Sequence, residues 1–268
     1  MRTLLAVPLF CLFCLLPLCA ESAHLSGIAH VAFRVADLDK SRDFYEKLGF
    51  EQAFEFKDDT GKVTQAFIKV NDSQFIELYP RKEDSQSLGL MHFCYDAQDI
   101  MSVWSAYVKA GLSPREVKKA KAGNLLFILH DPDRQVVEFT QYVPGSLHSE
   151  DRGKHLGEHR ISDHLQGATL FVKDVIEERA FYADKLGFPQ ESGVDQTVLR
   201  VGRDELKLEP ARAKVNGEIS FEVTNIRHAF DALRDFGVAP KMVGETVQVN
   251  DHDGVIIVFA RAARESKH

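Results

Sequence analysis

Two histidines and two glutamates recur at nearly the same spacing in the first half of the chain. His30 and His92 are 62 positions apart, and Glu77 and Glu138 are 61 positions apart. Each histidine opens the first predicted strand of a repeating unit, and each glutamate lies in the last predicted strand of that unit. If the two units pair about a pseudo-two-fold axis, all four side chains converge on one point.

Two imidazoles and two carboxylates at one point would make a site for a divalent metal ion. This donor set suits Zn, Ni, Mn, Co or Fe. Both glutamates stand inside apolar segments, where a carboxylate is costly to bury unless it is paired or bound to a metal. A single histidine at a strand start is more often a packing or capping residue, so the matched positions carry the prediction. Positions left open on the ion would admit water or substrate oxygens.

Side chains on the same strand faces are candidates for substrate binding. Strand alternation places Arg34 on the face of His30 and Tyr79 on the face of Glu77. Arg34 could hold an anionic substrate group, or it could form a salt bridge at the strand end. Tyr79 could donate a hydrogen bond to a developing oxyanion, or it could pack in the core.

Two further residues near the predicted site have a structural and a functional interpretation. His130 precedes the turn at Asp131 and could act as a base beside the site, although capping of the turn is the simpler role. Cys94 shares the face of His92. We interpret it as a small buried residue rather than a nucleophile, because no paired basic residue is evident in the sequence.

The elements that must position these residues form a repeat of about 60 residues with the order β-α-β-β-β. Hydrophobic alternation and turn residues predict the elements of the first two units. In the first unit, strands are expected at His30–Val35, Glu51–Phe56, Thr64–Val70 and Gln74–Tyr79, with a helix from Asp37 or Asp39 to Lys47. In the second unit, strands are expected at Met91–Tyr95, Arg115–Lys119, Leu125–His130 and Val136–Tyr142, with a helix at Asp99–Ala110. A third unit begins at Ala168 and a fourth at Ile219.

Three segments, His30–Asp37, Phe44–Phe50 and Asp131–Phe139, resemble the vicinal oxygen chelate superfamily. It includes glyoxalase I, methylmalonyl-CoA epimerase, fosfomycin-resistance enzymes, bleomycin-binding proteins and extradiol dioxygenases. The resemblance covers residues 26–143 well and 165–262 more weakly. It implies an α+β fold of tandem βαβββ units, in which each of two glyoxalase-like domains pairs two units around a cup-shaped mixed sheet. The family's metal ligands fall at His30, Glu77, His92 and Glu138.

The resemblance also implies a small-molecule substrate whose vicinal oxygens chelate the metal. With four protein ligands we expect glyoxalase-like lyase or isomerase chemistry, with Glu138 or Glu77 as the catalytic group that moves a proton. An extradiol-type dioxygenase is the alternative, but those enzymes use two histidines and one glutamate in the later pair of units. A non-catalytic small-molecule binding protein, like the bleomycin-binding members, is another alternative, as is a structural pair with an idle first domain.

The second pair of units lacks the ligand set. Gly167, Lys207, Glu218 and Val258 align with the four ligand positions, so we expect this pair to bind no metal. It would act as a lid, as the contact surface of a homodimer or as a degenerate remnant. The predicted domains are therefore 25–143 with the metal site and 165–262 without it.

A polar linker at 144–164 joins the two predicted domains and holds four histidines. Their density suggests a metal-binding tract. The glycines and the polar composition of the segment favour a solvated linker instead. The histidines are His148, His155, His159 and His164.

The first 20 residues have the pattern of a secretory signal peptide. Arg2 is followed by an apolar run from Leu4 to Ala20. We therefore predict a secreted or periplasmic protein with no membrane span in its mature form. An uncleaved anchor or lipid attachment at Cys19 are alternatives. Three of the four cysteines lie in this segment, so the mature chain would hold no intramolecular disulfide.

The composition of the chain limits the kinds of partner that it can bind. The formal net charge is −7, and 44% of the residues are hydrophobic. This mixture supports a globular core, and the absence of a basic stripe argues against nucleic-acid binding. Export argues against a glutathione adduct as the substrate, because glutathione is chiefly cytosolic.

Overall fold

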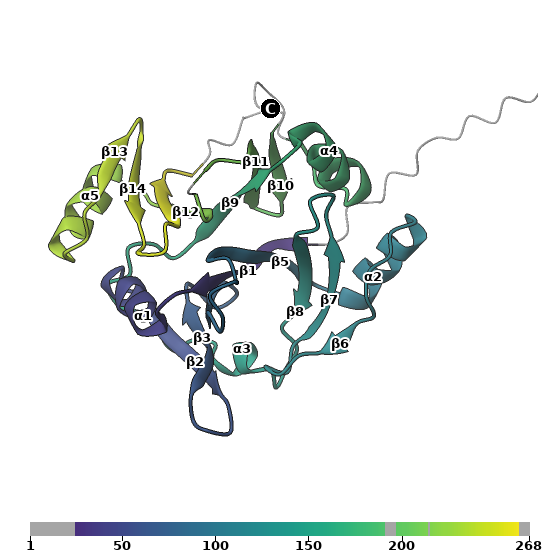
Figure 1. The fold of residues 1–268 in the computed structure, drawn as a ribbon, viewed down its shortest axis with the longest axis horizontal. Helices are drawn as coiled ribbons and strands as arrows, with labels where there is room; N and C mark the ends of the chain where they lie inside the picture. The colour runs from purple at the N-terminus through teal and green to yellow at the C-terminus, as the bar shows by residue number, and fades with distance from the viewer. Residues whose placement is uncertain (1–24, 191–196, 214, 263–268) are drawn as a thin grey trace, which may run out of the picture.

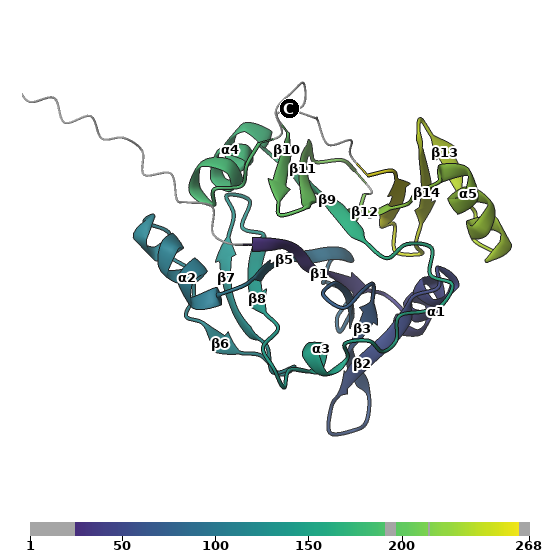
Figure 2. The same ribbon diagram turned by 180° about the vertical axis from the view of Figure 1, so that it is seen from behind.

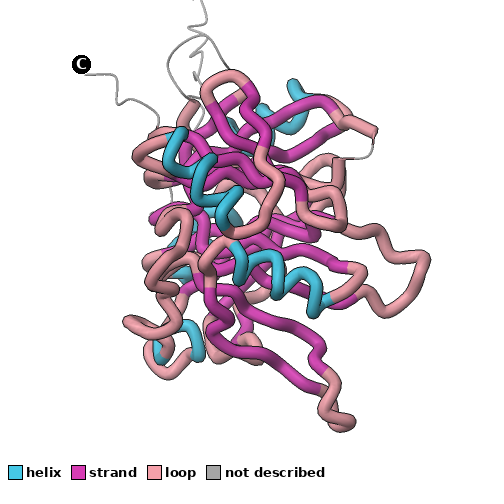
Figure 3. Tube along the Cα trace, turned by 90° about the vertical axis from the view of Figure 1, so that its left-hand side faces the viewer, coloured by secondary structure: helices cyan, strands magenta, loops and turns pink. Residues whose placement is uncertain are grey.

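The structure is a computed structural model that describes residues 25–190, 197–213 and 215–262. The predicted signal peptide lies outside the described residues. Strands make up most of the body, and the helices are few and short (Figure 3).

Residues 25–141 build the first sheet and its two helices. The elements are β1 (Leu25–Val35), α1 (Leu38–Lys47), β2 (Glu51–Lys57), β3 (Val63–Lys69), β4 (Phe75–Pro80), β5 (Gly89–Ala97), α2 (Ile100–Lys109), β6 (Lys118–Lys119), β7 (Leu125–His130) and β8 (Val136–Gln141).

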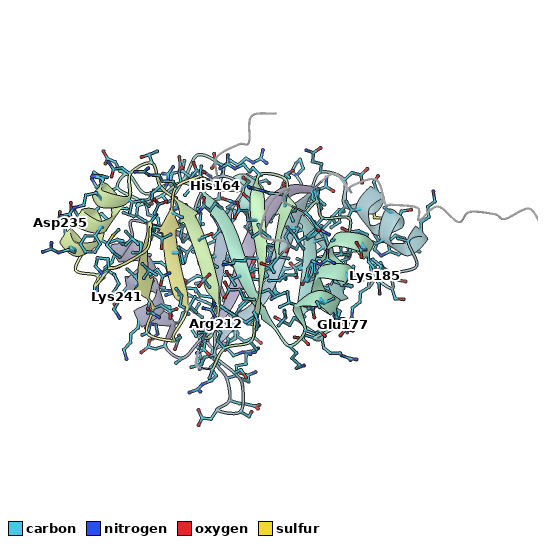
Figure 4. The ribbon with its side chains drawn as sticks, turned by 90° about the horizontal axis from the view of Figure 1, so that it is seen from above. His164, Glu177, Lys185, Arg212, Asp235 and Lys241 are labelled. Carbon is cyan, nitrogen blue, oxygen red and sulfur yellow. The ribbon has the colours of Figure 1, made fainter. Side chains whose placement is uncertain are left out.

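Residues 165–260 build the second sheet, after a short helix α3 (Leu147–Glu150) in the predicted linker. The elements are β9 (Leu165–Val172), α4 (Val175–Arg179), η1 (Ala180–Lys185), β10 (Val198–Val201), β11 (Asp204–Pro210), β12 (Glu218–Glu222), α5 (Ile226–Asp235), β13 (Lys241–Val243), β14 (Thr246–Asn250) and β15 (Ile256–Ala260). Figure 4 shows Glu177 and Lys185 on α4 and η1 at one end of this sheet, and Asp235 and Lys241 at the other end. We call each sheet with its helices a domain.

Local sequence signals explain the helices of the first domain. The Asp37 side chain accepts a hydrogen bond from the Lys40 N–H and caps α1. Gly49 follows the helix with a φ of 82°, a left-handed conformation that suits glycine. Asp99 caps α2 in the same way, through the N–H groups of Met101 and Ser102. Both predicted helices are confirmed, whereas the predicted strand at 115–119 is reduced to the two residues of β6.

The sheet topology follows the repeat. The first sheet has the order β2-β3-β4-β1-β5-β8-β7-β6 and the second has the order β10-β11-β9-β12-β15-β14-β13. In each sheet the two central strands are antiparallel, β1 with β5 and β9 with β12, and each has a parallel neighbour on its outer side. Figures 1 and 2 show the first sheet curving around one side of the molecule with α3 at the open side. This is the predicted fold class of cup-shaped mixed sheets.

The two domains hold each other through matching turns. The Asp133 carboxylate, between β7 and β8, accepts a hydrogen bond of 2.8 Å from the Lys173 N–H just before α4. The Asp253 carboxylate, between β14 and β15, accepts one of 3.1 Å from the Ala36 N–H just before α1. Each domain therefore supports the start of a helix in the other.

Apolar packing joins the two domains as well. A single cluster of buried hydrophobic residues extends from the first sheet into the second. Within it, the rings of Phe50 and Phe221 lie 5.1 Å apart, and those of Tyr95 and Phe188 lie 5.0 Å apart. Aromatic pairs at these separations stabilise the contact beyond the area that they bury.

The predicted linker packs against both domains. His148 is 2% exposed and His164 is 4% exposed, so the expectation of a solvated linker is wrong at these two positions. The His164 imidazole is bound by two carboxylates of the second domain, at 2.6 Å from Asp204 and 2.8 Å from Glu222, and Figure 4 labels it where the chain enters that domain. His155 and His159 are exposed, as expected for a linker.

Candidate functional site

The four predicted metal ligands lie together on the first sheet. The Nε2 atom of His30 is 3.3 Å from Nε2 of His92, 3.6 Å from Oε1 of Glu77 and 3.4 Å from Oε1 of Glu138. His30 and Glu77 are 2% and 5% exposed. The strand register explains the convergence, because Glu77 pairs with the residue two after His30, and Glu138 pairs with the residue two after His92.

These separations fit a metal-binding site. Tetrahedral bonds of 2.0–2.2 Å place ligand atoms about 3.4 Å apart, and three pairs of this cluster lie within about 0.2 Å of that distance. The groups His30, Glu77, His92 and His30, Cys94, Glu138 each bring their ligand atoms within 4.8 Å of one another. Each group can therefore hold a divalent ion and both share His30, whereas no group of the described residues brings all four predicted ligand atoms within that distance.

A buried tyrosine orients His30. The Tyr142 hydroxyl lies 3.2 Å from Nδ1 of His30 and donates its proton to the Ala29 carbonyl at 3.4 Å. The hydroxyl oxygen is therefore free to accept the Nδ1 proton of His30. That tautomer leaves a lone pair on Nε2, which faces the other three ligands. Such outer contacts typically fix a ligating imidazole.

Two neutral donors hold Glu77. Its Oε2 atom accepts hydrogen bonds from the Tyr79 hydroxyl at 2.7 Å and from the Gln65 amide at 2.9 Å, which leaves Oε1 directed at His30. The structure thus places the predicted substrate residue Tyr79 beside a ligand, in the lining of the same cavity. The role of Gln65 was not predicted, although a polar residue on the inward face of β3 could have indicated it.

Glu138 is held differently. Among the described residues, the groups that can donate to its carboxylate are the His30 imidazole, when Nε2 also carries a proton, and the Cys94 thiol. Burial raises the pKa of Cys94, so the thiol keeps its proton, which it can donate to Glu138 or to the Tyr95 carbonyl 4.0 Å from the sulfur. No amide or hydroxyl fixes Glu138 within the described part of the chain, which leaves this carboxylate freer to rotate than Glu77.

The charges of the cluster are unbalanced. Burial opposes the protonated form of His30, but the carboxylates of Glu77 and Glu138 together raise its pKa above the usual value. Burial lowers the pKa of His92. For Glu138, burial acts to raise the pKa, but His30 and His92 lower it overall. Two buried carboxylates thus favour a positive charge at their centre, as a proton on His30 or as a metal ion.

A cavity of about 280 Å³ opens above this cluster. Its floor includes Glu77, Glu138 and His148, its side wall includes Phe56 and Phe67, and its rim carries three exposed lysines, Lys118, Lys119 and Lys121. The Lys121 ammonium group lies 4.5 Å above the Phe56 ring. The site therefore combines a polar floor, an aromatic wall and a positive rim.

Two predicted substrate residues lie away from this cavity. Arg34 is half-buried and donates a hydrogen bond of 3.1 Å to the Ser87 carbonyl. His130 is exposed at the end of β7. Neither contributes to the cavity lining among the described residues, so the arrangement does not support the predicted substrate-binding role of either side chain.

The ligand positions of the second domain carry other side chains. The strand register of the second sheet repeats that of the first. It places Gly167, Lys207, Glu218 and Val258 at the positions equivalent to the four ligands, as the alignment of the repeats predicted. Glu218 accepts a hydrogen bond from the Thr169 hydroxyl, and Lys207 pairs with Glu209 at 2.6 Å.

Residues 27–139 match the family model of the Glyoxalase/Bleomycin resistance protein/Dioxygenase superfamily. The first domain is therefore similar to this superfamily, which contains metal-dependent enzymes. No curated protein matches the sequence significantly.

Solved structures of the superfamily share the fold along nearly the whole chain. The 2,3-dioxygenase LapB from Pseudomonas sp. KL28 is 15% identical, with a TM-score of 0.65 over 92% of this chain and 96% of its own. The Mn(II)-bound glyoxalase from Novosphingobium aromaticivorans is 16% identical, with a TM-score of 0.66 over 90% and 83%. An extradiol ring-cleaving dioxygenase from B. fuscum is 17% identical, with a TM-score of 0.63 over 93% and 76%. At these identities the likeness concerns the fold.

Within the described residues, no helix is both long and apolar enough to cross a membrane.

Proposed function

We propose that this chain is an exported, metal-dependent enzyme that acts on a small oxygenated substrate by glyoxalase-like lyase or isomerase chemistry. One observation carries the proposal: four ligand-type side chains, at matched positions of two repeats, meet around His30, and two of them, Glu77 and Glu138, line a cavity. A purely structural polar cluster would have no need of a cavity above it, nor of tyrosines that direct its imidazole and carboxylate inward.

The ion would be held by His30, Glu77, His92 and Glu138, and Zn, Ni, Mn, Co and Fe all suit these ligands. When bound, it would supply Lewis acidity that stabilises negative charge on the substrate oxygens.

The protein's own groups divide the remaining work. Glu77, fixed by Tyr79 and Gln65, is suited to hold its position throughout the reaction. Glu138, without such donors, is suited to take a proton from the substrate carbon next to an oxygen-bearing carbon. It would return the proton to a neighbouring carbon of the substrate. The aromatic wall at Phe56 and Phe67 would limit access of water to that step.

The rim indicates the charge of the substrate. Lys118, Lys119 and Lys121 surround the entrance of a cavity whose floor is acidic. They would attract an anionic substrate and place its negative group at the mouth, away from Glu77 and Glu138.

Export is part of the proposal and rests on the apolar run from Leu4 to Ala20. N-terminal sequencing of the protein recovered from outside the cytosol tests it. Cleavage near Ala20 or Ala23 would support export, and recovery of the intact N-terminus in the cytosol would contradict it.

The metal site is tested by elemental analysis after anaerobic purification, beside a His30→Ala/Glu138→Ala double variant. We expect about one equivalent of a divalent metal in the wild type and its loss in the variant. A wild-type protein that binds no metal even after reconstitution would overturn the enzyme assignment in favour of a binding protein.

The reaction class is tested separately. The loaded protein would be incubated with small α-hydroxycarbonyl compounds in D2O, under argon and in air. Incorporation of deuterium without oxygen uptake would support lyase or isomerase chemistry. Oxygen uptake with catechols by an iron-loaded protein would assign the extradiol alternative instead.

A further inference from the structure

A histidine from the linker forms part of the cavity floor. His148 lies in α3, is 2% exposed and sits among aromatic rings. Its imidazole stacks on Tyr142, with ring centroids 4.1 Å apart and planes 12° apart. The rings of Phe75 and Phe54 lie nearly perpendicular to it, with ring centroids 4.9 Å and 5.1 Å from that of the imidazole. The ring is therefore held in one place.

Neither nitrogen of this imidazole has a hydrogen-bond partner among the described residues. The N–H group can be directed at the face of a phenylalanine ring, which is a weak acceptor. The other nitrogen is itself an acceptor, and an aromatic face offers it no proton. Buried polar atoms without a partner are rare in native proteins. Among the described residues His148 is the one with two such atoms, and this pair points to a partner from outside the protein.

A molecule bound in the cavity could supply that hydrogen-bond partner. His148 lines the same cavity as Glu77 and Glu138, so a molecule bound over the metal ligands lies beside the imidazole. Burial, and secondly the charge of His30, lower the pKa of His148 to about 3. At neutral pH the ring is uncharged, and one of its two buried nitrogens is an acceptor.

We propose that His148 contacts the substrate and accepts a hydrogen bond from a substrate hydroxyl group, so that the site selects hydroxylated compounds over their deoxy analogues. This inference rests on the proposed function, since it places the substrate hydroxyl beside the residues that would hold the ion. It also gives the linker a part in the site.

Glycerate and lactate are suitable probes, because both are small hydroxy acids and only glycerate carries a second hydroxyl. We would titrate each into the zinc-loaded full chain by calorimetry. The wild type should bind glycerate about tenfold more tightly than lactate, the effect of one buried hydrogen bond. His148→Phe should keep zinc and lactate binding and lose the preference. A preference that survives in His148→Phe, or that the wild type lacks, would overturn the inference.

Two further variants and a melting experiment exclude a merely structural role. His148→Asn keeps an acceptor and should restore part of the preference. His159→Phe, an exposed change in the same linker, should leave it intact. His148→Phe should melt at the same temperature as the wild type or a higher one, because it removes an unpaired buried acceptor. A clear loss of melting temperature would show that His148 has a protein partner and would contradict the proposal.

The outcomes separate this inference from the proposed function. If zinc and lactate bind without discrimination, the inference fails and the enzyme assignment stands. If zinc itself does not bind, the proposed function fails first. Zinc binding with no affinity for either acid would count against both.

Discussion

The Tyr79 hydroxyl donates a 2.7 Å hydrogen bond to Oε2 of Glu77, and this contact directs the other carboxylate oxygen at His30. Tyr79 and Glu77 are two residues apart on β4 and share its inner face. Because alternate residues of a strand point to the same face, Tyr79 lies on the same side of β4 as the ligand Glu77 and can hold it in place.

Removing that support should weaken metal binding. We expect Tyr79→Phe to lower the affinity for Zn2+ by about tenfold or more, because Glu77 loses one of the two donors that orient it. The affinity would be measured by competition with a chelator. Tyr107→Phe is a matched control, since its hydroxyl bonds the Leu186 carbonyl away from the site. Equal losses in both variants would show a general effect of cutting a buried hydrogen bond.

The two glutamates should respond differently to the same substitution. Glu138→Gln should retain about one equivalent of metal and lose activity by about 10²-fold or more, because its proton-moving group is gone. Glu77→Gln should chiefly lower metal affinity, because the carboxylate that Tyr79 and Gln65 hold in place is lost. Metal content and kcat would be measured for each variant. The division of roles is wrong if Glu77→Gln holds metal normally while Glu138→Gln loses it.

Much of the fold could be predicted because its signals are local and repeated. Asp37 and Asp99 show as helix caps, and alternation marks the strands that carry the ligands. Matched spacing then paired His30 with His92 without any knowledge of register. Tyr142 was harder to predict as a partner of His30, because the contact joins residues 112 positions apart.

The rim lysines should act on substrate capture rather than on the chemical step. Replacing Lys118, Lys119 and Lys121 with Gln should raise KM for an anionic substrate by about tenfold and make kcat/KM less sensitive to salt. A Lys40/Lys185/Lys241→Gln variant removes the same charge from exposed positions elsewhere and should change neither. An unchanged salt dependence in the rim variant would remove the argument for an anionic substrate.

A buried carboxyl at the domain contact should make stability depend on pH. Burial raises the pKa of Glu178 from 4.5 to about 7, and the neighbouring charge of Asp131 adds to the effect. Between those values the folded chain holds a proton that the unfolded chain releases. The contribution of this group to stability is therefore full below pH 4.5 and declines as the pH rises through 7.

Glu178→Gln should remove that decline. The amide keeps the acceptor for the Asp133 N–H, and the variant should be more stable than the wild type by about 1–2 kcal/mol at pH 8. Urea unfolding at pH 4.5 and pH 8 measures the difference, which should vanish at the lower pH. The exposed neighbour Glu177→Gln is the control. A stability change in Glu178→Gln that is the same at both pH values would contradict the titration argument.

His148 marks the limit of sequence reasoning here. Its segment is polar and rich in glycine, which predicts solvent exposure. The burial comes from tertiary contacts with Phe54 on β2, Phe67 on β3 and Phe75 on β4. The residue pattern of 144–164 alone cannot predict that burial, because the aromatic rings around His148 come from other parts of the chain.

The reciprocal turns at Asp133 and Asp253 have a consequence for how the two halves of the repeat unfold. Each half supplies a side-chain carboxylate that accepts a hydrogen bond from a backbone N–H at the start of a helix in the other half. Truncating the second half would therefore expose the apolar contact and free the start of α1. For the same reason the two halves should unfold in one cooperative transition.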